Sequence, residues 1–373
     1  MKKNLLFLVS LLFLICSCGG GDEPNPQPPG PNPPDPNKPP VVVDFLDLSL
    51  TTINFTSEKD ASLVVVKTNL NWTVTKNADW ILLSASSGNK NTGFLIGAPA
   101  NNGFLRETTI TIKAGDKSKD IKITQNAPEK IKFTLKGVDF TLLPVEAEQS
   151  FVLQGGIYYE THNVVLSDYY ISETEITNAQ WFAVMGSLPY TGEDDFPNLP
   201  VIVNWNKINN KFLPEIRKQT HYEKLRLPTQ SEWRVAALGG KLSKNTEYSG
   251  SIYVDEVAWY YNNSQGIRHN VGLKKANELG LYDMSGNAAE WCYDWYKEWS
   301  EENPPPNNAN NPKGPESGTE KVVMGGDIRA NRLEYDINSC AIYKRNHLPP
   351  DYNALPDAQN ITGFRLVISK ADY

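Results

Sequence analysis

Histidine and cysteine are scarce in this sequence, whose 373 residues include only four of each. The histidines, at positions 162, 221, 269 and 347, have no ligand spacing to any cysteine, although a structural zinc site needs four such ligands. Long runs of like charge are also missing, although the net charge is −7. Without a stripe of Lys and Arg, the sequence argues against nucleic acid as a partner.

Hydrophobic residues gather at the start of the chain, but the apolar run Leu5–Ile15 is too short to span a bilayer. It follows the basic start Met1-Lys2-Lys3, which is typical of a signal peptide. The small residue Ser17 precedes Cys18, and this junction resembles a bacterial lipobox. We therefore predict that residues 1–18 are a lipoprotein signal peptide, that Cys18 is lipidated, and that the lipid anchors the protein to the outer membrane of the cell envelope, on its periplasmic or surface side. Ordinary soluble secretion is the alternative.

Two cysteines remain after lipidation, Cys292 and Cys340. In an oxidising compartment a lone pair of cysteines favours a disulfide over a metal site. We therefore predict a Cys292–Cys340 disulfide.

Proline dominates residues 19–40, "GGGDEPNPQPPGPNPPDPNKPP". The segment has little apolar surface to bury, and its prolines lack backbone donors, so it is predicted not to fold. A polyproline II segment extends by about 3.1 Å per residue. The segment is therefore predicted to be a stalk.

Residues 41–127 are predicted as all-β. The clearest hairpin pairs "TTITI" with "IKIT" around the turn Ala114–Asp116, because both runs alternate with period two. Short strands at this spacing suggest a small immunoglobulin-like sandwich. The stretches "NWTV", "DWILLSASSG" and "ANNGFLRETTITI" resemble the BACON module of Bacteroidetes surface proteins, which implies either carbohydrate binding or a spacer. Trp72 and Trp80 are candidates for stacking on a sugar, although at least one is expected in the core.

Residues 131–373 are predicted as a second, loop-rich domain. Two helices are predicted from capping boxes, Thr177 with Gln180 and Thr229 with Glu232. The motifs that follow in order are "EITNAQW", "LRLPTQSEWRVAALGG", "GLYDMSGNAAEWCYDWY", "VVMGGD" and "GFRLV". Together they resemble the formylglycine-generating, sulfatase-modifying factor family. The resemblance implies an irregular C-type-lectin-like domain, so the whole chain is assigned to the α+β class.

The segment "GLYDMSGNAAEW" is the richest in candidate site residues. The resemblance implies a structural calcium site there, formed by Asp283, Gly286, Ala288 and Glu290, and calcium favours such mixed oxygen ligands. A metal-free turn is the alternative. The enzymes of the family also hold copper with two cysteines four residues apart, and soft thiolates suit Cu(I). Only Cys340 is present here, because Tyr335 stands at the other position. Copper and catalysis are therefore not expected.

Some domains of this kind display ligands on residues just before the closing "GFRLV". By this resemblance a glycan or protein ligand is expected at residues rich in aromatic, amide and charged side chains. The predicted ligand-binding residues are Tyr335, Arg345, His347, Asp351, Tyr352 and Asn353. The function predicted is therefore binding by a catalytically degenerate lipoprotein. Two alternatives stay open: a formylglycine-generating or related oxidoreductase acting on sulfatase-type substrates, and a structural lipoprotein of the envelope or of gliding and secretion machinery.

Overall fold

The structure, a computed structural model, describes residues 42–101, 103–147, 149–153, 161–190, 196–220, 222–330, 337–352 and 361–372. The predicted signal peptide, Cys18 and the Pro-rich segment lie outside these residues. Among the helices described, none is both long and apolar enough to cross a membrane.

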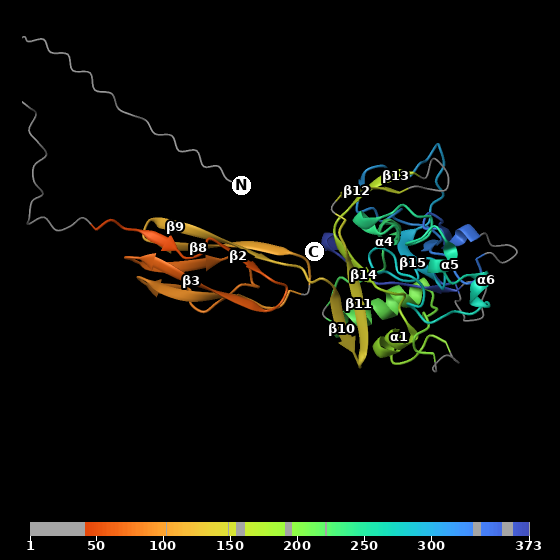
Figure 1. Cartoon of the computed structure of the whole chain (residues 1–373), viewed down its shortest axis with the longest axis horizontal. Coiled ribbons are helices and arrows are strands. Elements are labelled where there is room, and N and C mark those ends of the chain that lie inside the picture. The colour runs from red at the N-terminus through yellow and green to blue at the C-terminus, as the bar shows by residue number, and fades with distance from the viewer. Residues whose placement is uncertain are drawn as a thin grey trace, which may run out of the picture. The chain divides into compact units, whose positions relative to one another are not determined.

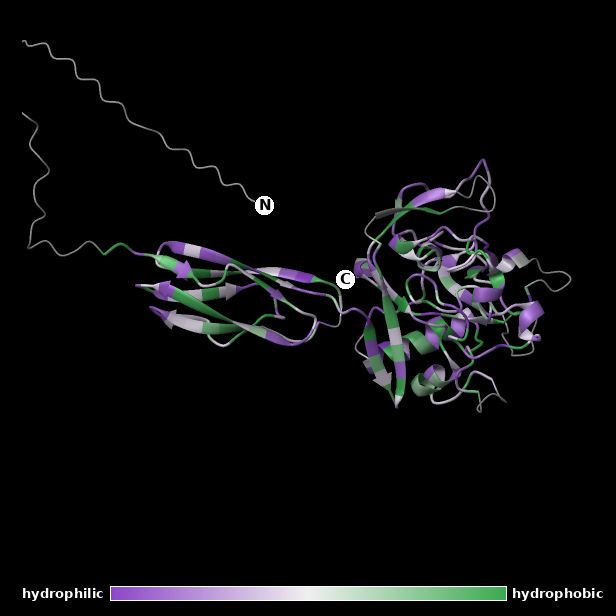
Figure 2. Cartoon of the chain, viewed as in Figure 1, coloured by the Kyte–Doolittle hydropathy of each residue, from purple (hydrophilic) through white to green (hydrophobic). Residues whose placement is uncertain are grey.

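The first part of the fold consists of strands β1 to β9 (Figure 1). Their bounds are β1 Leu46–Leu48, β2 Thr52–Phe55, β3 Asp60–Thr68, β4 Asn71–Lys76, β5 Leu82–Leu83, β6 Ser87–Asn89, β7 Thr92–Ala98, β8 Arg106–Ala114 and β9 Lys117–Gln125. They form a four-stranded sheet, β1-β3-β7-β5, and a five-stranded sheet, β2-β9-β8-β4-β6. Hydrophobic and hydrophilic residues alternate along these strands (Figure 2), as expected when one face of each sheet is buried.

The two sheets share one hydrophobic core. Trp72 lies in it with 2% of its surface exposed and donates from Nε1 to the carbonyl of Lys90 at 3.2 Å. Trp80 is half-buried, and the Arg106 guanidinium lies 4.5 Å from its ring centre. The expectation of at least one core tryptophan is therefore confirmed by Trp72. The predicted hairpin is also confirmed, because β8 and β9 pair from Arg106–Gln125 to Ala114–Lys117.

The second part of the fold contains strands β10 to β20. Their bounds are β10 Ile131–Leu135, β11 Val138–Val145, β12 Gln149–Leu153, β13 His162–Leu166, β14 Tyr169–Ser172, β15 Ala289–Trp295, β16 Ala309–Asn310, β17 Lys321–Met324, β18 Asn346–Leu348, β19 Thr362–Gly363 and β20 Val367–Ser369. Three small sheets result, with the strand orders β10-β11-β14-β20, β12-β13-β16 and β18-β17-β15-β19. The first of these sheets pairs β14 with β20, so the start and the end of this part are held together.

The helices are short. Their bounds are α1 Asn178–Met185, α2 Trp205–Lys207, α3 Leu213–Thr220, α4 Gln230–Ala237, α5 Val254–Val257 and α6 Tyr261–Ser264. A π-helical turn at Ile208–Phe212 joins α2 to α3, and 3-10 turns lie at Gly240–Leu242, Ile337–Cys340 and Lys370–Asp372. Both predicted capping boxes are present, at the starts of α1 and α4. Gly186 ends α1 in the left-handed region, with φ at 78°.

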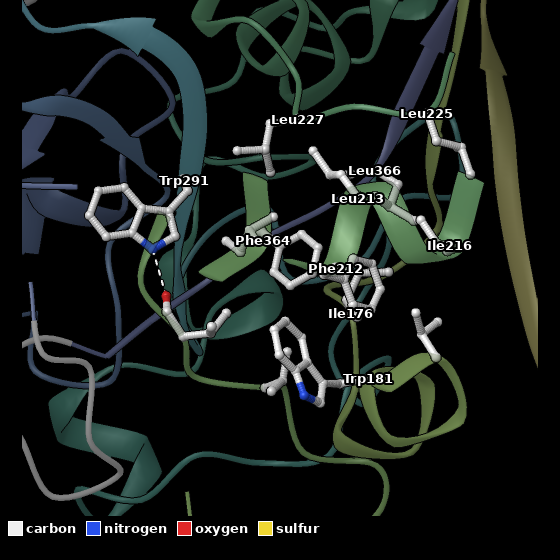
Figure 3. Packing of buried hydrophobic residues seen from close by; sticks show 14 of the residues in the cluster. Ile176, Trp181, Phe212, Leu213, Ile216, Leu225, Leu227, Trp291, Phe364 and Leu366 are labelled. Carbon is white, nitrogen blue, oxygen red and sulfur yellow. Dashed lines mark hydrogen bonds between the residues drawn. The ribbon is translucent and has the colours of Figure 1, made fainter. Parts of the chain in front are cut away.

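A core rich in aromatic residues surrounds the closing motif (Figure 3). Phe364 meets Phe212 edge to face at 5.2 Å, and Phe212 stacks on Trp181 at 5.0 Å. In the same cluster, Trp291 is fully buried and donates from Nε1 to the carbonyl of Val203 at 2.8 Å. The "GFRLV" and "AEWC" motifs thus meet in one core.

The predicted disulfide is wrong, because Cys292 and Cys340 are both free and buried. Cys292 projects from β15 into a cluster with Trp233 and Met284. Cys340, at the end of a 3-10 turn, packs in a different cluster with Tyr248 and Tyr260. Each thiol fills apolar space as a small hydrophobic residue.

The described part of the chain is mostly β-sheet with a few short helices, in agreement with the coarse prediction. The buried residues of β1 to β9 form a core separate from those that serve the later strands. The immunoglobulin-like and C-type-lectin-like assignments stay predictions from resemblance.

Candidate functional site

The loop before β15 makes a tight turn through three residues with positive φ: Asp283 at 56°, Gly286 at 80° and Asn287 at 61°. Gly286 is required here for space as well as conformation. A Cβ atom at this position would lie 2.3 Å from the carbonyl oxygen of Trp259. The loop therefore depends on a close approach of two backbones.

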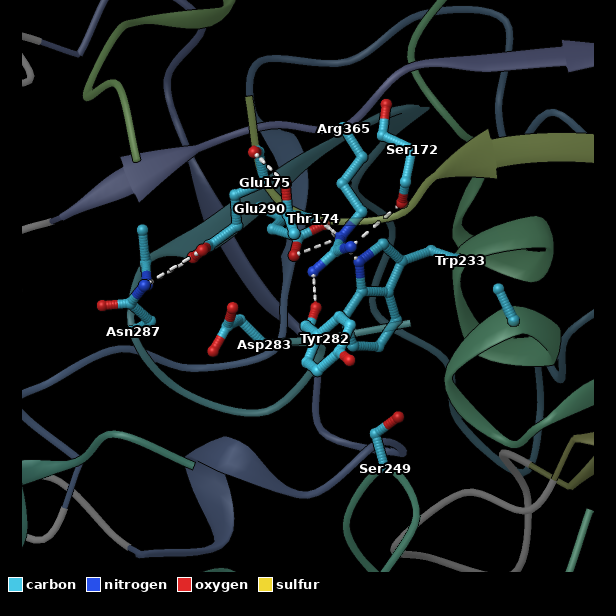
Figure 4. A network of polar contacts seen from close by, with 12 residues as sticks. Ser172, Thr174, Glu175, Trp233, Ser249, Tyr282, Asp283, Asn287, Glu290 and Arg365 are labelled. Atoms are coloured by element: carbon cyan, nitrogen blue, oxygen red, sulfur yellow. Dashed lines mark hydrogen bonds and ion pairs between the residues drawn. The ribbon is translucent and has the colours of Figure 1, made fainter. Parts of the chain in front are cut away.

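Asn287 and Glu175 hold this loop from inside the protein (Figure 4). The side chain of Asn287 donates to Glu175 Oε2 at 3.0 Å, and the amide of Ala288 donates to Glu175 Oε1 at 2.9 Å. Asn287 Oδ1 accepts from the amide of His269 at 3.0 Å. Glu175 was not predicted from the sequence, because its position in "ETEITN" is typical of the polar residues that precede a helix.

Glu290 forms a fully buried ion pair with Arg365 of the closing motif. Arg365 Nε lies 2.8 Å from Glu290 Oε1 and 2.9 Å from Oε2. The remaining guanidinium nitrogens donate to the carbonyls of Ser172, Glu173 and Tyr282. Trp233 Nε1 donates to Glu290 Oε2 at 2.8 Å. Figure 4 shows Arg365 among Ser172, Tyr282 and Glu290, so this arginine joins three other segments of the chain.

Three buried carboxyl groups, Glu175, Asp283 and Glu290, lie around one guanidinium. Burial raises the pKa of Glu175 well above its usual range, and the charges of Asp283 and Glu290 raise it further. Burial also raises the pKa of Asp283. A low-dielectric interior thus disfavours the charged forms of Glu175 and Asp283, while the hydrogen bonds from Asn287 and Ala288 support the Glu175 carboxylate.

Among the residues predicted to bind calcium, Asp283 has a carboxylate oxygen that could hold a cation. Its Oδ2 accepts from the amide of Gly272 at 2.7 Å, but its buried Oδ1 has no hydrogen-bond partner. Glu290 is less suited, because Arg365 and Trp233 already occupy its oxygens. Among the described residues, no three His, Cys, Asp or Glu side chains form a metal-binding group. Carbonyls of Gly286 and Ala288 would have to complete the ligand set.

The position of the family's copper thiolates is unsuited to copper here. Cys340 is fully buried, and burial raises the pKa of its thiol, so the thiolate that binds metal is disfavoured. Tyr335, at the position of the other cysteine, lies outside the described residues. The Cys340 carbonyl accepts from the hydroxyl of Ser285 at 2.8 Å, which fixes this turn to the loop before β15.

Two of the predicted ligand-binding residues meet at Tyr296. His347 stacks on its ring at 4.0 Å, and the Arg345 guanidinium lies 5.1 Å from the same ring centre. His347 also contacts Glu320 at 2.7 Å. Asp351 is exposed, whereas Tyr352 packs partly against the core. Asn353, like Tyr335, lies outside the described residues.

A cavity of about 340 Å³ lies beside Arg345, and most of its lining was missed by the sequence analysis. Its lining residues are His162, Gln230, Ser231, Asp294, Trp295, Lys297, Trp299, Asn303, Pro304, Pro305, Pro306, Pro312, Lys313, Gly314, Pro315 and Arg345. We call this cavity the Trp299 pocket. The signal that could have revealed it is "DWYKEW", where tryptophans and a lysine precede a proline-rich loop.

Behind the Trp299 pocket, Lys321 is buried among aromatic rings. Its Nζ lies 3.7 Å from the ring centre of Trp295 and 4.1 Å from that of Trp205. Burial lowers the pKa of Lys321 to about 8. Asp294 accepts from the amide of Gln230 at the start of α4, and burial raises its pKa to about 7. The wall of the pocket is thus fixed by internal contacts.

We expect the loss of either partner of the Glu290–Arg365 pair to be strongly destabilising, because both side chains are fully buried. Glu290→Gln or Arg365→Met should each lower the free energy of unfolding by about 3–5 kcal/mol, because each change leaves the other group buried without its partner. Urea unfolding measures this loss. As a control, Asp47→Asn breaks the exposed pair with Lys119 and should change the free energy of unfolding far less, because solvent screens such a pair. A loss for Arg365→Met no larger than that of the control would contradict the prediction.

Comparisons with known proteins agree with these motifs. The chaperone protein LppX of Paenibacillus barcinonensis is 32% identical over 253 residues, which are 54% of this chain and 85% of that protein. The formylglycine-generating enzyme of Thermomonospora curvata is 29% identical over 204 residues, which are 51% of this chain. The chain spans only 61% of that enzyme's length. Among solved structures, Treponema denticola variable protein 1 matches with a TM-score of 0.56 and 27% identity, over 65% of this chain and all of that one.

Family profiles match both parts of the chain. The BACON profile, which describes a candidate N-terminal binding domain, matches residues 70–126. The profile of the sulfatase-modifying factor enzyme 1-like domain matches residues 107–370, more than half of the chain. The resemblances seen in the sequence are therefore confirmed, and the chain belongs to the family of the sulfatase-modifying factor enzyme 1-like domain.

Proposed function

We propose that this protein is a cell-envelope lipoprotein whose sulfatase-modifying factor-like domain binds a glycan or protein ligand and does not oxidise cysteine. The observation that carries the proposal is the contrast between two places in the domain. The cysteine at the catalytic position is sealed in the core, whereas Arg345 and His347 lie with Tyr296 at the surface, beside a cavity. The buried Cys340 offers no accessible thiolate for oxidation of a substrate. Arg345, His347 and Tyr296 offer polar and aromatic groups at the surface for binding a ligand.

Two relatives support binding over chemistry. Treponema denticola variable protein 1 is named for variation, which suits a scaffold that presents changing surface residues. The relative from Paenibacillus barcinonensis is named a chaperone, which indicates that a protein ligand is compatible with this domain. The fold we propose for this scaffold is C-type-lectin-like, with an immunoglobulin-like sandwich before it.

The formylglycine-generating alternative rests on similarity to such enzymes. We expect no loss of the cysteine thiol when the purified full chain is incubated with copper and a sulfatase-motif peptide, as measured by mass spectrometry. In contrast, screening the same chain against glycan and envelope-protein arrays should give a ligand whose binding Arg345→Gln weakens.

The control for chemistry is Cys340→Ser, assayed beside an active formylglycine-generating enzyme. Turnover by the wild-type chain that disappears in Cys340→Ser would establish an enzyme and contradict the proposal. Binding of an array ligand that Arg345→Gln leaves unchanged would place recognition elsewhere on the chain. A chain that binds no ligand but copurifies in stoichiometric amounts with an envelope assembly would favour the structural alternative.

The lipid anchor is proposed from the hydrophobic run and the Ser17-Cys18 junction. Mass spectrometry of the native protein is expected to show a mature chain that begins at a lipidated Cys18. Replacing Cys18 with Ser should prevent the modification and release the protein from the membrane fraction. An unmodified Cys18, or a mature chain that starts elsewhere, would show that the lipobox prediction is wrong.

Calcium is proposed as a structural ligand of the loop before β15. When bound, calcium would neutralise the carboxylate of Asp283, and binding only to the folded chain would raise its melting temperature. Asp283→Asn should remove that rise, whereas the exposed Asp116→Asn should keep it. Glu290→Gln should lower the melting temperature with or without calcium, because it breaks the ion pair with Arg365. Melting curves of the wild type that are identical in calcium and EDTA would leave only a metal-free turn.

A further inference from the structure

The Trp299 pocket combines ring surfaces with positive charge. Trp295, Trp299 and prolines on both sides of the loop at residues 303–315 form its apolar walls. Trp299 is half-buried and belongs to none of the hydrophobic clusters, so part of its ring faces the cavity. Because Trp299 is not needed to fill a core, its place in the pocket wall suggests a role in contact with a ligand.

Three cationic side chains line the same pocket. The Arg345 guanidinium lies 5.7 Å from the ring centre of Trp299, and Lys297 Nζ lies 5.3 Å from it. Lys313 is exposed on the opposite loop. The acidic lining residue, Asp294, is buried against the start of α4. A ligand that touches Trp299 therefore lies within reach of positive charge.

The protein outside the pocket is acidic, with a net charge of −7. Glu298, Glu301 and Glu316 are exposed on the flanking segments but do not line the cavity. Their charges oppose long-range attraction of an anion, and salt screens such attraction within about 10 Å. Selection of an anion must therefore come from direct contact with Arg345, Lys297 and Lys313.

We propose that the Trp299 pocket binds an acidic saccharide unit, with its sugar ring against Trp299 and its carboxylate at Arg345 and the two lysines. This inference rests on the proposed ligand-binding function and names the class of ligand. A planar guanidinium matches a carboxylate in two parallel hydrogen bonds. The C–H groups on one face of a sugar ring pack on an indole. An acidic peptide side chain has no such ring face.

The size of the pocket also favours a saccharide unit over an extended peptide. A volume of about 340 Å³ is at the low end of the range of roughly 300–1,000 Å³ for small-molecule sites. The fixed walls, held by the Asp294 contact to α4 and by Lys321 behind Trp295, suit a rigid ring more than a flexible chain. Rigid partners lose less conformational freedom on binding.

Titration calorimetry of the full chain with trigalacturonate tests this inference, with its methyl ester as the uncharged analogue. We expect the ester to bind at least about ten-fold more weakly, because it lacks the charged acceptor that pairs with the guanidinium and the lysines. Arg345→Gln and Trp299→Ala should each lower the affinity for trigalacturonate by about ten-fold or more. Lys313→Gln should weaken it less, because Lys313 is exposed.

Lys344→Gln is the matched control, since it removes the same charge beside Arg345 but outside the pocket lining. Its affinity for trigalacturonate should equal that of the wild type, and melting curves should confirm that every variant is folded. Equal binding of the acid and the ester, equal binding of a triglutamate peptide, or full affinity in Trp299→Ala would each overturn the inference. If trigalacturonate fails to bind while an array ligand depends on Arg345, this inference is wrong and the proposed function stands.

Discussion

The buried ion pair between Glu290 and Arg365 is the constraint on which the second part of the fold depends. A charge in the interior must be paired and hydrogen-bonded, and each donor of Arg365 finds a partner in a different segment. The end of β14 at Ser172, the loop at Tyr282 and β15 at Glu290 are therefore fixed around one side chain. The ion pair thus holds these loops and short strands in fixed positions relative to one another.

This constraint gives a structural role to several residues of the motifs that the chain shares with its family. Glu290, Asn287 and Arg365 are fully buried, and their partners are all internal. Cys340 is sealed in the same way. We propose that ligand binding lies on the segments that this interior supports, where aromatic and cationic residues after β15 line the Trp299 pocket.

Local features of the fold were predictable from the sequence, and long-range ones were not. The capping boxes at Thr177 and Thr229 and the β8–β9 hairpin depend on residues close in sequence, so periodicity and caps indicate them. The pair of Glu290 with Arg365 links residues 75 apart, and nothing local marks it. The predicted disulfide between Cys292 and Cys340 rested only on the fact that two cysteines remained. The number of cysteines does not show that the two thiols lie in separate hydrophobic clusters. The segment "DWYKEW" marks one wall of the Trp299 pocket, but the shape of the pocket depends on how a distant proline-rich loop returns to β15.

A double-mutant cycle at Glu290 and Arg365 tests the central claim most directly. The free energies of unfolding are measured in urea for the wild type, Glu290→Gln, Arg365→Met and the double variant. If the two side chains stabilise the domain through each other, their coupling energy should reach about 2–3 kcal/mol, at the upper end for contacting residues. A coupling energy near zero would show that the pair does not organise the domain, and would contradict this account.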